Sequence, residues 1–373
     1  MRLFIEPVDV WLFRDNKPFD AGSDHRAVSL FPPTPQVVAG ALRSHHLVVQ
    51  GVDLRLPKNS RLRRAYVQQY IQPLVGTAEE PPDGFHLRGP VIARWEAGKL
   101  VRYYPLPADA FLVGDEYRAP IPTVRPDGPQ TNLPGGLHPL WITPHQRGER
   151  EAAPGGRWLA EKDLITYLQQ GTIPASNVIP GAELFITEDR LGIRLQDATR
   201  TTEEGLIYQV GFVRLKPQVG LEVEVEGLPE RDPNNPRPWP ERGILKIGGE
   251  ARAGRYSQLA ENQTEPWPQM YMQGVTRFKL YFVTPACFSH GWCPADWGKW
   301  FDPAPRLVAS AVSRPLVLGG FDLARGVHKP SRRYVPVGSV FFFEGEPRLK
   351  PGIEAISDFG ARLGFGQFII GRW

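Results

Sequence analysis

The sequence predicts an α+β protein made of two halves, each with the order strand, helix, strand, strand, helix, strand. Three observations indicate this class. Alternating apolar segments occur in both halves of the 373-residue chain, residues 35–49 carry apolar side chains at helical spacing, and glycine- and proline-rich stretches separate these segments. The order is the ferredoxin-like (RRM-like) βαββαβ pattern. We expect two such domains, over residues 1–195 and 196–373, with long Pro/Gly-rich insertions.

The first half opens with a strand and a helix. Residues 3–13 are rich in strand-forming residues and alternate in polarity, and residues 35–49 follow helical spacing. Pro35 stands near the start of that helix, where its missing N–H costs nothing. Two short strands follow, at residues 101–105 and 110–113.

The second half contains more strands, and its connections are long. In order, the predicted elements are strands at residues 205–215, 221–226, 275–283 and 339–344, a helix over about residues 352–359, and a strand at residues 367–372. The 38 glycines and 39 prolines of the chain gather in clusters, which predicts long, rigid loops. The strongest breaks are residues 76–84, 125–136, 231–243 and 261–269.

Composition excludes several classes of protein. Hydrophobic residues make up 41% of the chain, enough for a substantial core, yet no run approaches the roughly 18 apolar residues of a membrane span. The N-terminus resembles a strand and not a secretory leader, so we expect a cytoplasmic protein. The spacing of Cys287 and Cys293 fits neither a zinc knuckle nor a redox C-x-x-C motif. We therefore expect two reduced thiols, no metal site and no cofactor.

Positive charge is concentrated in two runs, although the net charge is only +4. Residues 54–64 contain five basic residues and no acidic one, and residues 314–333 contain five basic residues against Asp322. Either run is suited to contact a polyanion, or is simply a solvated charged face.

A loop between the first strand and the first helix carries polar groups suited to phosphates. Prolines before the helix favour an extended backbone, because a residue that precedes proline avoids the α region. On structure alone this is a rigid connecting loop. As a nucleic-acid contact, the same loop and helix would direct Arg14, His25, Arg26 and Arg43 at phosphates.

Two further candidate segments lie near the C-terminus. In residues 314–344, Lys329, Arg332 and Arg333 stand beside Tyr334, and basic residues next to aromatic ones are typical of proteins that bind single-stranded nucleic acid. Residues 360–371 read GARLGFGQFIIG, in which glycines expose backbone N–H groups, either to a phosphate or simply within a tight turn.

An ordered series of motifs resembles the RAMP superfamily of CRISPR proteins, and specifically the third subunit of the type III-B Cmr complex. The motifs are RDNKPFDAG (residues 14–22), FPPTPQVVAGALR (31–43), GIRLQDATRTTEEGLIYQVGFVRL (192–215), LKIGGEARAGRY (245–256), LVLGGFDLARGVHKPSRRYVPVGSVFFFE (316–344) and GFGQFIIG (364–371). They cover the chain nearly end to end.

The resemblance implies a function. It implies two ferredoxin-like folds, no nuclease activity, a position at the 5′ handle of the CRISPR RNA, and contacts with the large polymerase-cyclase subunit and the backbone RAMP subunits. The glycine-rich loop of the superfamily maps onto Gly364, Gly366 and Gly371, although four residues rather than five separate the last two and none of the four is basic. Arg362 or Arg372 would then supply the charge. We further expect Tyr334 or Phe365 to stack on unpaired bases.

Two alternatives remain open. A metal-independent RAMP endoribonuclease that processes CRISPR repeat RNA would need an imidazole near neutral pKa, and its candidates are His25, His45 and His46, with Arg26 and Arg43 to stabilise charge. His45 and His46 are predicted on opposing sides of the helix. A pure protein scaffold without RNA contact is the other alternative. With 10 tryptophans and 19 phenylalanines, some rings are expected in an obligate interface with a partner.

Overall fold

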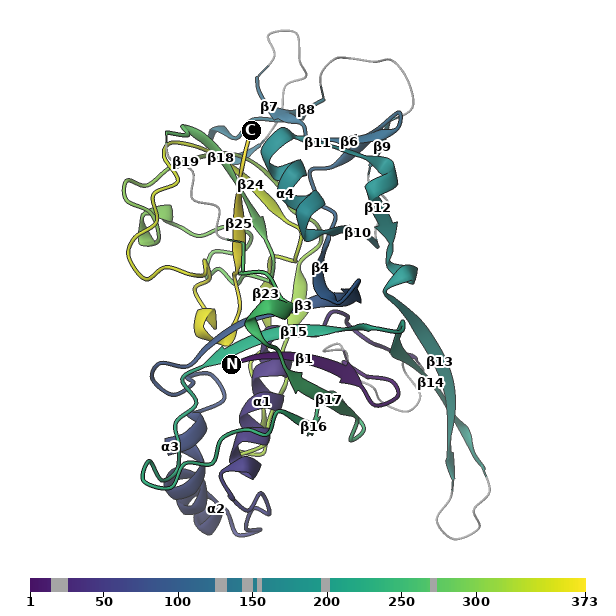
Figure 1. Cartoon of the computed structure of the whole chain (residues 1–373), viewed down its shortest axis with the longest axis vertical. Coiled ribbons are helices and arrows are strands. Elements are labelled where there is room, and N and C mark those ends of the chain that lie inside the picture. Colours follow the sequence, from purple (N-terminus) through teal and green to yellow (C-terminus); the bar gives the residue numbers. More distant parts are fainter. Residues whose placement is uncertain (15–25, 125–132, 143–149, 153–155, 196–201, 269–273) are drawn as a thin grey trace.

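The computed structural model describes residues 1–14, 26–124, 133–142, 150–152, 156–195, 202–268 and 274–373. Strands dominate, and two antiparallel sheets organise the molecule (Figure 1). The α+β class is therefore confirmed. Within the described ranges, no helix is long and apolar enough to cross a membrane.

The larger sheet has eight strands, which come from residues 2–258. Its order is β12 (Val178–Pro180), β10 (Arg157–Ala160), β4 (Lys99–Pro105), β3 (His86–Glu96), β15 (Val219–Glu226), β1 (Arg2–Pro7), β17 (Ala253–Gln258) and β16 (Arg242–Lys246). All neighbours are antiparallel.

Helix α1 (Pro35–Val49) packs on this sheet and has the bounds that the sequence predicts. Pro35 occupies the first turn, and Val38, Ala39 and Leu42 are buried with Leu3 of β1. The helix leads into α2 (Ser60–Tyr66), a π-helical turn and α3 (Gln72–Val75), at the lower left of Figure 1.

The second sheet has four antiparallel strands: β19 (Arg306–Ala311), β24 (Val340–Glu344), β18 (Arg277–Phe282) and β25 (Phe368–Arg372). Helix α4 (Glu161–Gln170) of the N-terminal part packs against it, since Tyr167 and Leu168 share a core with Tyr281 and Phe342. The predicted helix over residues 352–359 is wrong. That segment is irregular, and only a 3₁₀ turn, η7 (Ala361–Leu363), follows it.

Smaller sheets complete the fold. They are β13 (Phe185–Leu195), β14 (Thr202–Leu215) and β2 (Arg26–Val28); β11 (Thr172–Pro174), β6 (Glu116–Arg118), β5 (Phe111–Val113) and β9 (Arg150–Ala152); β7 (Ile121–Pro122) and β8 (Leu140–Trp141); β20 (Leu316–Leu318) and β23 (Arg332–Tyr334); and β21 (Phe321–Asp322) and β22 (Val327–His328). The β13–β14 ribbon extends at the lower right of Figure 1.

The two main sheets are joined through buried polar contacts. Lys279 of β18 and Asp109 are both fully buried, with 3.0 Å between Nζ and a carboxylate oxygen, and the Tyr281 hydroxyl donates to the carbonyl of Pro105. The larger sheet runs from β1 to β17 and so crosses the predicted division at residue 195, because β15 and β17 pair with strands of the first part. The ferredoxin-like description of each half stays a prediction.

Candidate nucleic-acid interface

The fold brings the two basic runs of the sequence together. Arg63 of α2 donates from Nε to the carbonyl of Ala324 (2.9 Å), 261 residues away in sequence, and from its terminal nitrogen to the carbonyl of Leu323. Asn59 caps α2, because its side-chain oxygen accepts from the backbone N–H groups of Arg61 and Leu62. These contacts hold α2 against the turn between β21 and β22.

We call residues 316–334 the arm, because β20 pairs with β23 and β21 with β22 along its length. The arm is fixed to α1 as well, since the side-chain amide of Gln36 donates to the carbonyl of Gly319 (2.8 Å). In the β20–β23 register, Val317 lies opposite Arg333 and both are exposed, whereas Tyr334 on the alternate position is buried. The outer face of the arm therefore presents Arg333.

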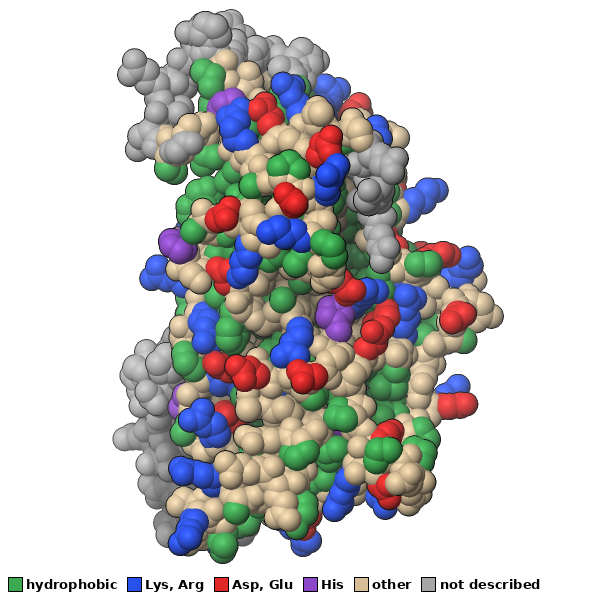
Figure 2. Space-filling view, turned by 90° about the vertical axis from the view of Figure 1, so that its left-hand side faces the viewer, with side chains coloured by type: hydrophobic (Ala, Val, Ile, Leu, Met, Phe, Trp, Pro, Cys, Tyr) green, Lys and Arg blue, Asp and Glu red, His purple; other side chains and the backbone are tan. Residues whose placement is uncertain are grey.

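The surface shared by α2 and the arm is cationic and open. Helix α2 buries none of its residues. Five exposed cations lie on or beside α2 and on the arm, and in the described part of the chain none of them forms an ion pair. We call these residues the basic surface: Lys58, Arg61, Arg64, Arg325 and Arg333. Figure 2 faces the side on which α2 and α3 lie, and Lys and Arg side chains are interspersed there with hydrophobic and acidic ones along its lower part. Such a surface can neutralise the phosphates of a polyanion.

Other predicted contacts are internal. Tyr334 is 2% exposed and Phe365 fully buried, with ring centroids 4.8 Å apart in the main core. Burial also raises the pKa of the Tyr334 phenol. This geometry argues against the expectation that these rings stack on bases, because neither ring reaches the surface.

Arg43 is also used inside the protein. Its guanidinium donates to the carbonyls of Val75 (3.0 Å) and Thr77 (2.6 Å) and lies over the ring of Phe85. Burial lowers the pKa of Arg43 to about 10. This geometry argues against the predicted phosphate contact, because the donors of Arg43 face carbonyls of its own chain.

Arg332 and Arg362 have partners on their own chain too, and Lys329 is partly withdrawn from solvent. Arg332 pairs with Glu79 (3.1 Å) and stacks over Phe359. Arg362 is exposed and donates to the carbonyl of Pro82. Lys329 is half-buried, and burial together with the positive charge of Arg43 lowers its pKa. Since Arg332 and Arg362 both meet the loop of residues 76–84, which is acidic, their charge is partly neutralised there.

The glycine-rich loop is a joint between the sheets. Gly364 has φ +97°, and a Cβ there would lie 2.9 Å from the carbonyl oxygen of Gly89 in β3. The N–H of Gly364 donates to Ala361 and that of Gly366 to Pro285, so neither amide is open to a phosphate. A Cβ on Gly371 would meet the carbonyl of Leu168 in α4. Close internal packing therefore explains these glycines, and we call the region of Arg43, Arg332, Tyr334, Gly364 and Phe365 the glycine-loop joint.

The remaining predicted residues lie near β2 and β14. Arg14 is exposed and its backbone forms a bridge with Ser29. Arg26 begins β2, which pairs in parallel with β14, but its side chain and all of His25 lie outside the described residues. The structure therefore does not bring Arg14 and Arg26 into the basic surface, since the β13–β14 ribbon and α2 occupy opposite sides of Figure 1.

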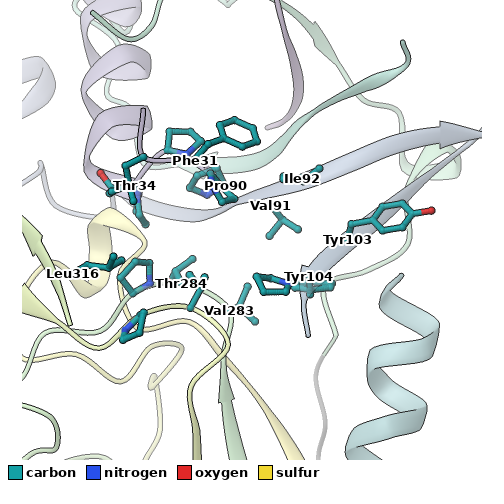
Figure 3. A pocket seen from close by; sticks show the side chains of 18 of the residues that line it. Phe31, Thr34, Pro90, Val91, Ile92, Tyr103, Tyr104, Val283, Thr284 and Leu316 are labelled. Carbon is teal, nitrogen blue, oxygen red and sulfur yellow. The ribbon is translucent and has the colours of Figure 1, made fainter. Parts of the chain in front are cut away.

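A cavity of about 210 Å³ separates the two sheets (Figure 3). Residues 30–34 and the first residue of α1, Pro35, form one wall, β3 and β4 another, and residues 283–285 a third. Among the described residues that line it, none has a charged side chain. The proline-rich motif therefore forms an apolar wall of this cavity.

The candidate catalytic histidines of α1 are engaged in packing. His46 is 1% exposed; Trp239 Nε1 donates to its Nδ1 (3.0 Å), and its Nε2 lies 2.9 Å from the carbonyl of Pro229. Because one ring nitrogen accepts and the other faces a carbonyl, His46 is neutral with the proton on Nε2, and burial lowers its pKa. His45 contacts the Tyr256 hydroxyl and the same Trp239, so the two histidines do not lie on opposing sides.

Cys287 is buried, Cys293 is half-buried, and both are free thiols whose pKa is raised by burial. Across the described residues, no group of three or more His, Cys, Asp or Glu side chains is placed to hold a metal ion.

Comparison with known proteins identifies the family. A chain in each of two cryo-EM structures of the type III-B Cmr-beta complex is similar over 92% of this chain and 86% of its own length. In the first structure the complex is bound to cognate target RNA and AMPPnP, in state 1 (14% identity, TM-score 0.48). In the second it is bound to cognate target RNA (16% identity, TM-score 0.45). Among curated proteins, no sequence matches. The family model for CRISPR-associated protein (Cas_Cmr3) matches residues 3–373. The chain therefore belongs to the Cas_Cmr3 family and is a Cmr subunit of CRISPR defence, which confirms the resemblance that the ordered motifs predict.

Proposed function

We propose that the chain is a non-catalytic subunit of the type III-B Cmr effector complex that binds the 5′ handle of the CRISPR RNA and docks the large polymerase-cyclase subunit in antiviral defence. The observation that carries RNA binding is the meeting of the two basic runs through Arg63. Separately, each run is an ordinary solvated face. Together they form one surface along which Lys and Arg side chains can take the place of the counterions of a ribose-phosphate backbone.

The strand orders support two ferredoxin-like halves. In the eight-stranded sheet, β3, β15, β1 and β17 are neighbours, and in the four-stranded sheet β19, β24, β18 and β25 are neighbours. Numbered along the chain, both orders are second, third, first, fourth, which is the order of a βαββαβ unit. Helix α1 occupies the first connection of one half, whereas short 3₁₀ turns, η6 (Trp297–Lys299) and η7, stand in the connections of the other.

Non-catalytic binding is favoured over the endoribonuclease by the state of the α1 histidines. A general base needs a free lone pair and a route to a ribose hydroxyl, and the lone pair of His46 accepts from Trp239. Incubating the purified chain with repeat RNA in EDTA should leave the RNA uncut. Cleavage that disappears in His25→Ala would instead support the enzyme.

RNA binding is tested by a pair of double variants. Arg61→Ala/Arg64→Ala should weaken binding of single-stranded RNA about tenfold and reduce the salt slope by about 1.4, because two phosphate contacts are lost. Fluorescence anisotropy at several salt concentrations measures both quantities. The matched control is Arg277→Ala/Arg348→Ala, whose side chains are 60% and 68% exposed in the C-terminal half and should leave binding nearly unchanged. An equal loss in both doubles would mean that net charge, and not this surface, governs binding.

Docking to the large subunit is tested by co-expression. The expected result is a stable complex that survives high salt, since a mainly apolar interface is far less salt-sensitive than a phosphate contact. A chain that remains monomeric beside the large subunit would contradict this part of the proposal. A chain that joins the complex but has no salt-dependent RNA affinity would be the pure scaffold.

A further inference from the structure

Phe321 is the most exposed of the described aromatic side chains. Only three Phe, Tyr or Trp side chains of the described residues are strongly exposed: Tyr70 (36%), Trp292 (38%) and Phe321 (47%). Trp292 is stacked parallel to Phe341, and Tyr70 leans on Tyr66. Phe321 lies on the arm, next to the basic surface, and is not part of a closed stack.

The ring of Phe321 is paired with that of His328 across the β21–β22 ladder. The centroids are 5.2 Å apart and the planes meet at 80°. In a perpendicular pair, at least one face of each ring is not covered by the other. His328 is itself exposed, so the two rings form an open corner on the surface of the arm.

The backbone holds this corner in place. In the turn after β21, the Asp322 carboxylate accepts from the N–H of Arg325 (3.1 Å) and its carbonyl accepts from the N–H of Gly326 (2.7 Å). The N–H of Lys329 donates to the carbonyl of Gly320 (2.9 Å), which closes the base of the small hairpin. A pre-ordered ring loses little conformational entropy when a ligand stacks on it.

Cations flank the two rings. Arg325 stands on the turn between them, and Arg63 joins that turn to α2, which carries Arg61 and Arg64. An aromatic face among arginines suits a ligand that has both a flat π-system and phosphates. Two strands of two residues each are too narrow for the roughly 800 Å² that each partner buries in a standard protein interface.

We propose that Phe321 and His328 form a stacking platform for one unpaired nucleobase of RNA, whose flanking phosphates lie against the basic surface. The inference rests on the proposed RNA binding and adds to it a single-stranded substrate with a base held at a fixed place. It also replaces Tyr334 and Phe365, which the sequence indicates as base-stacking rings, with Phe321, a ring on the same arm as Tyr334 that reaches solvent.

The test compares a short oligouridylate with an abasic oligomer of the same length, each titrated against the full-length chain. Wild-type protein should bind the oligouridylate about tenfold more tightly than the abasic oligomer. Phe321→Ala should remove that preference without changing the salt slope, because the phosphate contacts remain. Phe321→Trp should restore it. Leu323→Ala removes another exposed apolar side chain of the arm, 71% exposed, and should bind both oligomers as the wild type does.

The outcomes separate the two proposals. If the wild-type chain binds neither oligomer, the proposed function fails and the platform with it. If it binds RNA with steep salt dependence but Phe321→Ala keeps the full preference for bases, the platform is wrong and the function stands. If Phe321→Ala and Leu323→Ala leave RNA binding intact but both weaken complex formation with a co-expressed Cmr subunit, the corner is a protein contact and the inference is overturned.

Discussion

The basic surface and the glycine-loop joint contain the same kinds of residue, yet they use them in opposite ways. At the joint, Arg43 donates to carbonyls of its own chain, Tyr334 packs on Phe365, and Gly364 allows β3 to come close. At the basic surface, α2 buries nothing. The difference teaches that burial, and not residue type, decides whether a cationic motif is available to a ligand.

The largest expected effect concerns Gly364. Gly364→Ala should lower the free energy of unfolding by about 3 kcal/mol, since the new Cβ has both an unfavourable φ and the carbonyls of Leu87 and Gly89 beside it. Gly352→Ala is the matched control, because its φ is similar (+76°) but its Cβ would meet nothing within 4 Å, and about 1 kcal/mol is expected. Chemical denaturation measures both. An equal loss of unfolding free energy in the two variants would mean that close packing at Gly364 adds nothing to the cost of its positive φ.

Arg43 gives the next largest effect. Arg43→Met should cost about 2 kcal/mol of stability, because the carbonyls of Val75 and Thr77 lose a buried donor, and should leave the salt slope of RNA binding unchanged. The same change at exposed Arg61 should alter stability by less than about 0.5 kcal/mol. A reduced salt slope in Arg43→Met would place Arg43 at the RNA after all.

A smaller effect is expected from pH. The folded state holds His46 with a pKa below its ordinary 6.5, so the unfolded chain takes up a proton first as the pH falls. The contribution of His46 to stability is therefore fully present above about pH 6.5 and declines as the pH falls below it. His46→Asn should lose less stability than the wild type between about pH 8 and about pH 5.5, in denaturant titrations at the two values. If His46→Asn and the wild type lose the same stability between the two pH values, the burial of His45 and His86, whose pKa values are also lowered, dominates the decline.

Local patterns predicted much of the fold. Helix α1 was predictable to the residue, because Pro35 and the spacing of Val38, Ala39 and Leu42 are signals within about two turns of each other. Strands β15, β18, β24 and β25 were also expected within about two residues. Helix α2 was not expected, since a basic segment that buries nothing has no apolar periodicity to find. The helix expected near residue 355 does not form, because long-range contacts order that segment instead.

The site was less predictable than the fold. Both basic runs were visible in the sequence, but their contact depends on hydrogen bonds from Arg63 to carbonyls 260 and 261 residues away, which no local pattern encodes. Tertiary packing likewise decides that Phe321, and not Tyr334, is the exposed ring. Alternation along a short strand predicts two faces, but it does not say which face another element will cover.

The attachment of the arm to α1 and α2 has a consequence for biosynthesis. During translation α1 and α2 are synthesised first, and the arm follows only after more than two hundred further residues. For most of its synthesis the growing polypeptide therefore carries only the part of the basic surface that lies on or beside α2. Until then, the side chains of Gln36 and Arg63 lack the carbonyls of Gly319 and Ala324, to which they donate in the folded protein. The complete basic surface, and with it the proposed binding of guide RNA, can therefore form only when synthesis is nearly finished.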